Sequence, residues 1–159
     1  MIFVSVGTHK QNFDRLLKKI DELVEKGIIK ERIMAQIGYT NYKPKHYSYK
    51  DFIGMEEFDK QIKNCSLFIT HAGEGNVGTG LQFEKKMIVI ARRAKYGEHT
   101  NDHQLEMAGA VKKSKQAIVC DVEGLAKCIP MASKIKVKKT EHAKKIIQIL
   151  EGALSEGLI

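Results

Sequence analysis

The stretch Leu67–Gly80 holds the residues whose types and spacing best fit a chemical task. It opens with an apolar run, continues with His71, and then carries four glycines in eight positions: Gly73, Gly75, Gly78 and Gly80. Glycine lets the backbone approach a phosphate closely, and the free N–H groups at a helix N-terminus attract an anion. The stretch therefore predicts a phosphate-binding turn between a strand and a helix. The alternative is a tight turn that needs positive φ, although four glycines exceed that need.

The spacing Gly73-x-Gly75-x-x-Gly78 also matches the dinucleotide fingerprint. That function needs an acid, or a basic contact for a 2′-phosphate, about 20 residues further on. Arg92 and Arg93 stand there. An NADP-binding module is therefore one alternative, although this fingerprint normally opens a domain and here lies in the middle of the chain.

A second group of polar residues surrounds position 100. His99 and His103 are one helical turn apart with Asp102 near them, a spacing that suits either a metal ion or hydrogen bonds to a ligand. Hydrogen bonding is favoured and no metal is expected, because the spacing fixes no third strong ligand. His71 fits a general base or a hydrogen-bonded histidine at a strand end. No nucleophile elbow is visible, and Cys65 has no local partner that would activate it.

The composition is typical of a globular protein, with 43% hydrophobic and 29% charged residues. No stretch approaches the roughly 18 apolar residues that a membrane span needs. The opening residues MIFVSVG lack the basic segment and cleavage site of a signal peptide. The three cysteines lack CxxC spacing and are expected to be buried in a reducing compartment. We expect one domain over residues 1–159, in the cytoplasm.

The chain is basic, with a net charge of +8. Residues 111–159 hold ten lysines against five acids, so five of the eight charge units lie there. A basic surface suits nucleic acid, anionic lipid or an acidic partner. No aromatic residues are interleaved with these lysines and no RNA-binding signature is present, so no nucleic-acid partner is expected. A membrane surface or an acidic partner is favoured.

Short apolar strands alternate with helical segments along the chain. Strands are expected at Ile2–Val6, Ile33–Gly38, Tyr49–Ile53, Leu67–Thr70, Met87–Ala91 and Ala117–Cys120. Helices are expected from the N-cap Asn12 to Gly27, at Met55–Ile62, after the glycine turn, at Asp102–Val111, at Val122–Met131 with a break near Pro130, and at Ala143–Leu154. The aromatic segment Tyr39–Tyr49 is expected to be a loop, whose aromatic side chains either form an exposed contact surface or pack over a sheet edge.

This alternation predicts an α/β fold with a mainly parallel sheet covered by helices on both faces. Such sheets bind ligands at the carboxyl ends of their strands. Three loops should therefore converge at that edge: Gly7–Gln11, His71–Gly75 and Arg92–His103.

Four stretches of the sequence together resemble one family. They are Gly7-Thr8-His9 with Phe13–Leu16, Ile69–Gly75, Lys85–Ile90 and Tyr96–Glu106. Over residues 2–150 the chain resembles the small donor-binding subunit of two-chain glycosyltransferases. These subunits are similar to the C-terminal half of the bacterial enzyme that adds N-acetylglucosamine to lipid I. They include the small subunit of the dolichol-linked UDP-N-acetylglucosamine transferase and bacterial capsule and exopolysaccharide enzymes. The pairing of GTH and FDRL with YGEHTNDHQLE is specific to this family.

The resemblance implies a Rossmann-like half of a GT-B fold that binds a UDP-sugar and transfers the sugar with inversion, without a cofactor or metal. It implies a second, membrane-anchored chain that presents a polyprenyl-diphosphate-linked saccharide and recruits this chain to the inner face of the membrane. The implied catalytic base is His9, unless the partner supplies it. The implied donor-binding residues are Gly7, Thr8, His71, Ala72, Gly73, Glu74, Gly75, Asn76, Val77, Tyr96, Glu98, His99, His103 and Gln104.

Four positions depart from the family pattern. Ala72 replaces a glycine, Asn76 a serine or threonine, and Ala91 a proline. Thr79 stands where the lipid I enzyme has a glutamate that holds the ribose. Gly78 and Gly80 are also expected to weaken the helix that starts there. These departures favour an alternative function, a non-catalytic subunit that raises the activity or stability of a partner glycosyltransferase.

Overall fold

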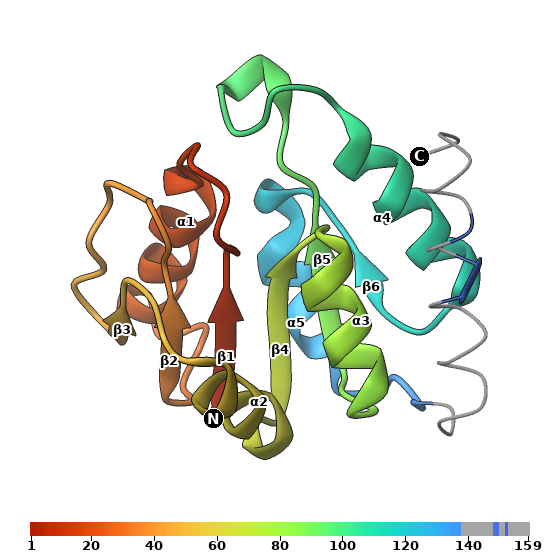
Figure 1. Cartoon of the computed structure of the whole chain (residues 1–159). Helices are drawn as coiled ribbons and strands as arrows, with labels where there is room; N and C mark the ends of the chain where they lie inside the picture. Colours follow the sequence, from red (N-terminus) through yellow and green to blue (C-terminus); the bar gives the residue numbers. More distant parts are fainter. Residues whose placement is uncertain (138–147, 150–151, 153–159) are drawn as a thin grey trace.

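The computed structural model of the protein describes residues 1–137, 148–149 and 152 (Figure 1). The strands are β1 (Ile2–Ser5), β2 (Ile33–Gln36), β3 (Ser48–Lys50), β4 (Leu67–His71), β5 (Met87–Ile90) and β6 (Ile118–Val119). The helices are α1 (Asp14–Glu25), α2 (Met55–Asn64), α3 (Glu74–Gln82), α4 (His103–Ser114) and α5 (Leu125–Ala132), with short 3-10 turns η1 (Ala94–Tyr96) and η2 (Val122–Gly124). The helix predicted at Ala143–Leu154 falls mostly on residues outside this description.

The strands form one sheet in the order β3-β2-β1-β4-β5-β6. Every pairing between these strands is parallel, including that of Ser5 with Thr70 where β1 runs beside β4. The predicted α/β class is confirmed, and the described sheet is entirely parallel where a mainly parallel one was expected. All the strands therefore end at one edge, the upper edge in Figure 1.

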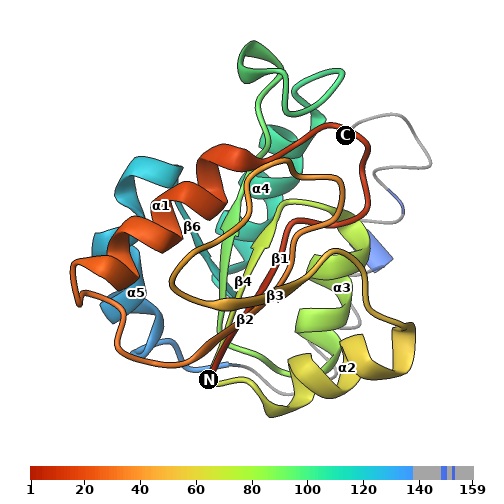
Figure 2. The same ribbon diagram turned by 90° about the vertical axis from the view of Figure 1, so that its left-hand side faces the viewer.

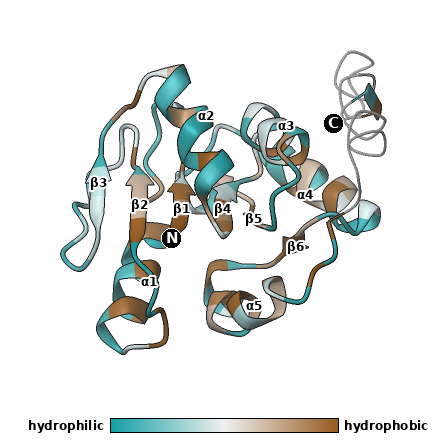
Figure 3. Cartoon of the chain, turned by 90° about the horizontal axis from the view of Figure 1, so that it is seen from below, coloured by the Kyte–Doolittle hydropathy of each residue, from teal (hydrophilic) through white to brown (hydrophobic). Residues whose placement is uncertain are grey.

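Helices cover both faces of the sheet, as Figures 2 and 3 show from two directions. On one face, α1 and α5 pack through apolar residues such as Leu16 and Leu125. On the other face, α2, α3 and α4 pack through Ile62, Val77 and Val111. The central strands β1, β4 and β5 are buried along their whole length, which explains why they read as continuous apolar runs and not as alternating ones. Strand β3, at one edge of the sheet, is exposed.

Several boundaries differ from the expectation. The N-cap of α1 is Phe13 and not Asn12, whose Oδ1 instead accepts a hydrogen bond from the Asp14 N–H at 3.5 Å. Strand β3 ends early because the Ile53 N–H donates to the side chain of Gln36 and not to a neighbouring strand. Helix α5 continues through Pro130 to Ala132. Helix α3 is continuous despite Gly78 and Gly80.

The loop after β2 is only partly exposed. Tyr42 and Tyr47 pack against the core beside α1, so for them the structure favours the packed alternative, whereas Tyr39 is 53% exposed. The buried carboxylate of Asp21 accepts hydrogen bonds from the Tyr42 hydroxyl at 2.6 Å and from the Lys45 N–H at 2.8 Å. This hydrogen bond, with burial, raises the pKa of Tyr42 to about 12. One acidic side chain of α1 therefore holds the loop in place.

Among the described residues, no helix combines the length and the apolar character that crossing a membrane requires.

Candidate functional site

A cleft of about 860 Å³ opens at the carboxyl ends of β1 and β4. These strands are neighbours, but the chain leaves β1 toward β2 on one side and β4 toward β5 on the other. Open α/β sheets bind ligands at such a switch point. Residues from all three predicted loops line the cleft, so their convergence is confirmed: Gly7, Thr8, His9, Lys10, Gln11, His71, Gly73, Glu74, Gly75, Asn76, Thr100 and Gln104.

His71 lies between two glycines at the floor of the cleft. A Cβ added to Gly73 would stand 2.1 Å from His71 Nε2, and one added to Gly7 would stand 2.5 Å from His71 Cε1. Both glycines are therefore required by close approach to the imidazole. The positive-φ alternative for the glycine turn is wrong, because only Gly7, Gly27, Gly38 and Gly97 among the described glycines have positive φ.

Helix α3 begins at the cleft with its backbone donors uncapped. Gly73 is the N-cap, and within the described structure no side chain caps this helix. The first intrahelical bond runs from the Val77 N–H to the Gly73 carbonyl at 3.0 Å. The preceding N–H groups, of Glu74, Gly75 and Asn76, have no partner within the helix, and the positive end of the helix dipole lies there. This is the local geometry of an anion site.

Asn76 ties this helix to the sheet. Its Nδ2 donates to Ser5 Oγ and to Thr70 Oγ1, both at 2.9 Å, and Thr70 Oγ1 donates to the Ser5 carbonyl at 3.0 Å. The amide thus links the ends of β1 and β4 under the cleft. Val77, by contrast, is fully buried in the core beneath α3, so its side chain does not reach the cleft.

The surroundings of His71 keep its imidazole neutral. Burial, with the positive charge of Arg92 nearby, lowers the pKa of His71 to about 3. So weak a base suits hydrogen bonding to a ligand better than proton abstraction at neutral pH. Of the two sequence interpretations of His71, the structure favours the hydrogen-bonded histidine.

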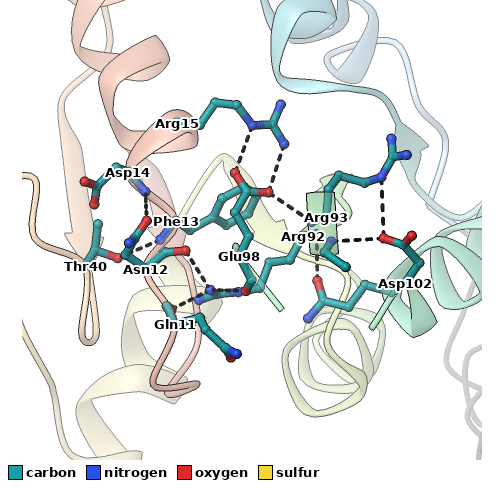
Figure 4. A network of polar contacts seen from close by, with 12 residues as sticks. Gln11, Asn12, Phe13, Asp14, Arg15, Thr40, Arg92, Arg93, Glu98 and Asp102 are labelled. Carbon is teal, nitrogen blue, oxygen red and sulfur yellow. Dashed lines mark hydrogen bonds and ion pairs between the residues drawn. The ribbon is translucent and has the colours of Figure 1, made fainter. Parts of the chain in front are cut away.

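The buried side chain of Arg92 links the loop after β1 to the loop after β5 through hydrogen bonds (Figure 4). It is 1% exposed, and its guanidinium donates to the carbonyls of Val6 at 2.5 Å, Gln11 at 2.7 Å and Glu98 at 3.1 Å. Burial lowers its pKa to about 10, which still leaves it charged. A 2′-phosphate would have to displace these backbone contacts, and Arg93 Nε lies 3.7 Å from Asp102 Oδ1. Neither arginine lines the cleft, so the structure gives the NADP alternative no support.

The side chain of Gln104 is oriented by the backbone of Arg92. Its Oε1 accepts a hydrogen bond from the Arg92 N–H at 2.9 Å. The contact occupies the acceptor end of the amide and leaves the Nε2 donor group for a ligand in the cleft that Gln104 lines. This agrees with the predicted role of Gln104 as a donor-binding residue, which stays a prediction.

Glu98 and Tyr96, two further predicted site residues, do not line the cleft. The carboxylate of Glu98 is 2% exposed and accepts from Arg15 and from the Arg93 N–H at 2.9 Å (Figure 4). The Tyr96 ring packs under the Arg15 guanidinium at 4.4 Å from its centroid. These residues position the loop after β5, so a direct contact with a ligand has no support from the cleft geometry.

A smaller hollow of about 170 Å³ adjoins the cleft and shares Gly73, Glu74 and Gln104 with it. Three predicted residues, Ala72, His99 and His103, line this hollow together with Met107. The described residues contain no group of three or more candidate metal ligands.

His9 stands at the boundary between the two hollows. Its ring stacks on that of His99 with a centroid separation of 4.5 Å. Its Nδ1 accepts a hydrogen bond from the Gln11 N–H at 3.4 Å. In the neutral ring the proton is then on Nε2, so Nε2 is a donor in this tautomer. The role of His9 as a general base stays a prediction, and it would require the other tautomer or loss of this contact.

Lys10, Gln11 and Thr100 line the cleft and were not singled out as site residues from the sequence. They lie in loops that the strand order already placed at this edge. Only the three-dimensional position of each loop residue distinguishes a lining side chain from a neighbouring one.

The fold and the cleft define a Rossmann-like α/β domain with an uncapped helix start at the switch point of its sheet. Residues 1–150 match the glycosyltransferase family 28 C-terminal domain, and the chain belongs to this family.

Two curated relatives are UDP-N-acetylglucosamine–N-acetylmuramyl-(pentapeptide) pyrophosphoryl-undecaprenol N-acetylglucosamine transferases of Prochlorococcus marinus, strains MIT 9215 and MIT 9312. The chain is 27% identical to the first over 131 residues and 26% identical to the second over 147 residues. These matches cover 76% and 86% of this chain but 34% and 38% of the relatives. The chain thus spans little more than a third of their length.

Solved structures show the same fold. The glycotransferase of kitacinnamycin has a TM-score of 0.67 at 17% identity, covering 95% of this chain and 39% of that one. MurG of Acinetobacter baumannii has a TM-score of 0.60 at 16% identity, covering 92% and 44%. ALG13 has a TM-score of 0.57 at 17% identity, covering 87% of this chain and 88% of that one. The expected Rossmann-like half of a GT-B fold is confirmed.

Proposed function

We propose that this chain is the donor-binding catalytic part of an inverting glycosyltransferase, which moves a sugar from a UDP-sugar to a polyprenyl-diphosphate-linked saccharide. The observation that carries the proposal is the uncapped start of α3, which faces the cleft beside His71 and Gly73. Family membership supports it. So do the names of the curated relatives, which state UDP-N-acetylglucosamine as donor and a pyrophosphoryl-undecaprenol compound as acceptor.

In the proposed reaction the donor diphosphate lies on the N–H groups of Glu74, Gly75 and Asn76. The acceptor hydroxyl attacks the anomeric carbon as the bond to the diphosphate breaks, and the UDP leaving group keeps the electron pair. Backbone donors at the helix start stabilise the charge that develops on it. Gln104 and His103 bind sugar hydroxyls. The proton of the acceptor hydroxyl passes to His9 or to a base of the partner chain.

The acceptor-binding half comes, in this proposal, from a second, membrane-anchored chain that recruits this one to the inner face of the membrane. This chain covers only 34% and 38% of the two curated relatives, which supports an acceptor-binding half that lies outside it. The ALG13 comparison supports a separate chain, because there the same fold covers 88% of that chain. The product would be a surface polysaccharide.

The runner-up is a non-catalytic subunit that raises the activity or stability of a partner glycosyltransferase. Two observations favour it. Glu98 is committed to Arg15, and Thr79 Oγ1 donates to the Gly75 carbonyl at 2.8 Å. Neither side chain is therefore free to hold a ribose or a sugar.

Calorimetric titration of the purified chain with UDP tests the proposal. Gly73→Asp is a poor probe because any side chain there collides with His71. Gly75→Asp is sharper, since a Cβ at Gly75 meets nothing within 4 Å and Gly75 lines the cleft. Gly78→Asp is the matched control, because a Cβ there is also unobstructed but Gly78 does not line the cleft.

We expect micromolar to low millimolar binding that Gly75→Asp abolishes and Gly78→Asp retains. Equal loss of UDP binding in both variants would show that the substitutions act by disturbing helix α3 and not by blocking the cleft. UDP binding that appears only with the co-purified partner and persists in Gly75→Asp would instead favour the accessory subunit.

A further inference from the structure

Two imidazoles from loops far apart in the sequence meet at the cleft. His9 follows β1 and His99 follows β5, and their rings stack with centroids 4.5 Å apart and planes inclined by 25°. Both side chains are half-buried. His9 lines the main cleft, and His99 lines the adjoining hollow. The stacked rings therefore stand between the two spaces in which a donor would lie.

The backbone orients both rings in the same way. His9 Nδ1 accepts from the Gln11 N–H at 3.4 Å, and His99 Nδ1 accepts from the Asn101 N–H at 3.3 Å. Each contact joins a ring to the amide two residues later. With Nδ1 as acceptor, each neutral ring carries its proton on Nε2. The pair thus offers two N–H donors, and an added proton on either ring would sit on Nδ1 at the cost of one of these backbone contacts.

The charges around the pair disfavour a proton on His9 when the cleft holds no anion. The positive charge of Arg92 acts on His9, and Lys10 lines the same cleft as His9. His71, at the end of β4, is neutral and interacts with both rings. On the α4 side, His103 shares the smaller hollow with His99. The one carboxylate that lines both spaces in the described structure is Glu74. Burial, His99 and Arg92 together lower the pKa of His9.

We propose that the stacked imidazoles of His9 and His99 form a second phosphate subsite, opposite the start of α3, and that the pair takes up a proton from solvent when a diphosphate diester binds. The inference rests on the proposed function, because it assigns this pair to the same donor. One phosphate meets the backbone N–H groups of α3, and the other meets the imidazole pair. The negative charge of the ligand outweighs the repulsion from Arg92 and stabilises the imidazolium. A pair that already carries this proton cannot take the acceptor proton, so the inference assigns that step to the base of the partner chain.

The proposal predicts a particular pH dependence. Binding is strongest at pH values below the pKa of the liganded pair and weakens as the pH rises through it. One unit of difference in pKa between the free and liganded states corresponds to about a tenfold difference in affinity. We therefore expect the affinity for UDP-N-acetylglucosamine to fall about five- to tenfold from pH 6 to pH 8. The diphosphate of this ligand is a diester and does not titrate in that range, so the proton must come to the protein.

Calorimetry in two buffers of different ionisation enthalpy measures the proton uptake directly. Titrations with UDP-N-acetylglucosamine at pH 6.5 should show uptake by the wild type and almost none by the His9→Gln/His99→Gln double variant. His46→Gln is the matched control, because His46 lies outside both hollows and should leave the uptake unchanged. NMR titration of the wild-type imidazoles, with and without ligand, gives the same answer without any variant that has to fold.

The outcomes separate this inference from the proposed function. Binding of UDP-N-acetylglucosamine with no proton uptake, or with uptake that persists in the double variant, overturns the imidazole subsite and leaves the donor site intact. If this ligand does not bind, ADP-ribose serves as a second diphosphate diester. Proton-linked binding of ADP-ribose that needs His9 and His99 would keep the subsite and overturn the UDP-sugar assignment. Binding of neither ligand, by the chain alone or with the co-purified partner, overturns both.

Discussion

Arg15 and Glu98 are 83 positions apart in the sequence and form a bidentate ion pair, with Arg15 Nε to Oε1 at 2.8 Å and Arg15 Nη2 to Oε2 at 3.1 Å. Arg15 belongs to the FDRL segment at the start of α1, and Glu98 belongs to the YGEH segment after β5. The two halves of the family signature are therefore in direct contact. Their contact fixes the position of the loop after β5, whose Thr100 lines the cleft.

The Glu98→Gln variant should be less stable than the wild type by about 2 kcal/mol, because it removes the charge that a largely buried Arg15 contact and a backbone N–H depend on. Urea denaturation measures the difference. Glu22→Gln is the control, since Glu22 pairs with Lys26 on the surface and exposed pairs contribute little. A Glu98→Gln variant with the wild-type denaturation midpoint would contradict a stabilising role for this pair.

Gly80→Ala and Gly78→Ala should change stability in opposite directions although they lie in one helix. A Cβ at Gly80 would stand 2.2 Å from Met87 Sδ, whereas a Cβ at Gly78 meets nothing within 4 Å. We expect Gly80→Ala to lower the unfolding free energy by about 1–3 kcal/mol through overpacking. We expect Gly78→Ala to raise it by about 0.5–1 kcal/mol through helix propensity. Thermal melts of both variants check the signs, and destabilisation by Gly78→Ala would show that its surroundings are not open.

Stability should fall in acid because of His71. Its pKa is about 3 in the folded protein and about 6.5 when unfolded, so below pH 6.5 the unfolded state binds the extra proton. The loss reaches about 2 kcal/mol at pH 5. Urea denaturation at pH 7 and pH 5 should show it in the wild type, and His71→Gln should remove that part of the decline. An identical pH dependence in the variant would place the effect on another group.

Asp21 should control the protease sensitivity of the loop after β2. Its carboxylate accepts from Tyr42, from the Lys45 N–H and from the His46 N–H, the last two at 2.8 Å. Asp21→Ala leaves these donors without an acceptor and should destabilise the protein by about 2 kcal/mol. We expect trypsin to cleave after Lys45 several-fold faster in this variant, whereas the bond after Lys43 precedes Pro44 and is not a trypsin site. Mass spectrometry of the first fragments identifies the site, and unchanged cleavage there would refute the role of Asp21.

The sequence by itself determined the α/β class, the strand–glycine–helix order at β4 and the edge at which three loops converge. These features follow from local patterns. Continuous apolar runs predict strands buried on both faces, and glycines after a strand predict a close backbone approach. The family match over residues 1–150 then agreed with the resemblance that four short stretches of the sequence had together indicated.

Only the tertiary structure decided which residues at that edge face the cleft. Arg92 and Glu98 look like ligand contacts in the sequence, yet both are buried, Arg92 against backbone carbonyls and Glu98 against Arg15. The stacking of His9 on His99 is equally invisible in a linear pattern, because it joins loops that follow different strands. Charged side chains are buried only where partners compensate them. Those partners are set by packing between distant segments, which periodicity and spacing do not encode.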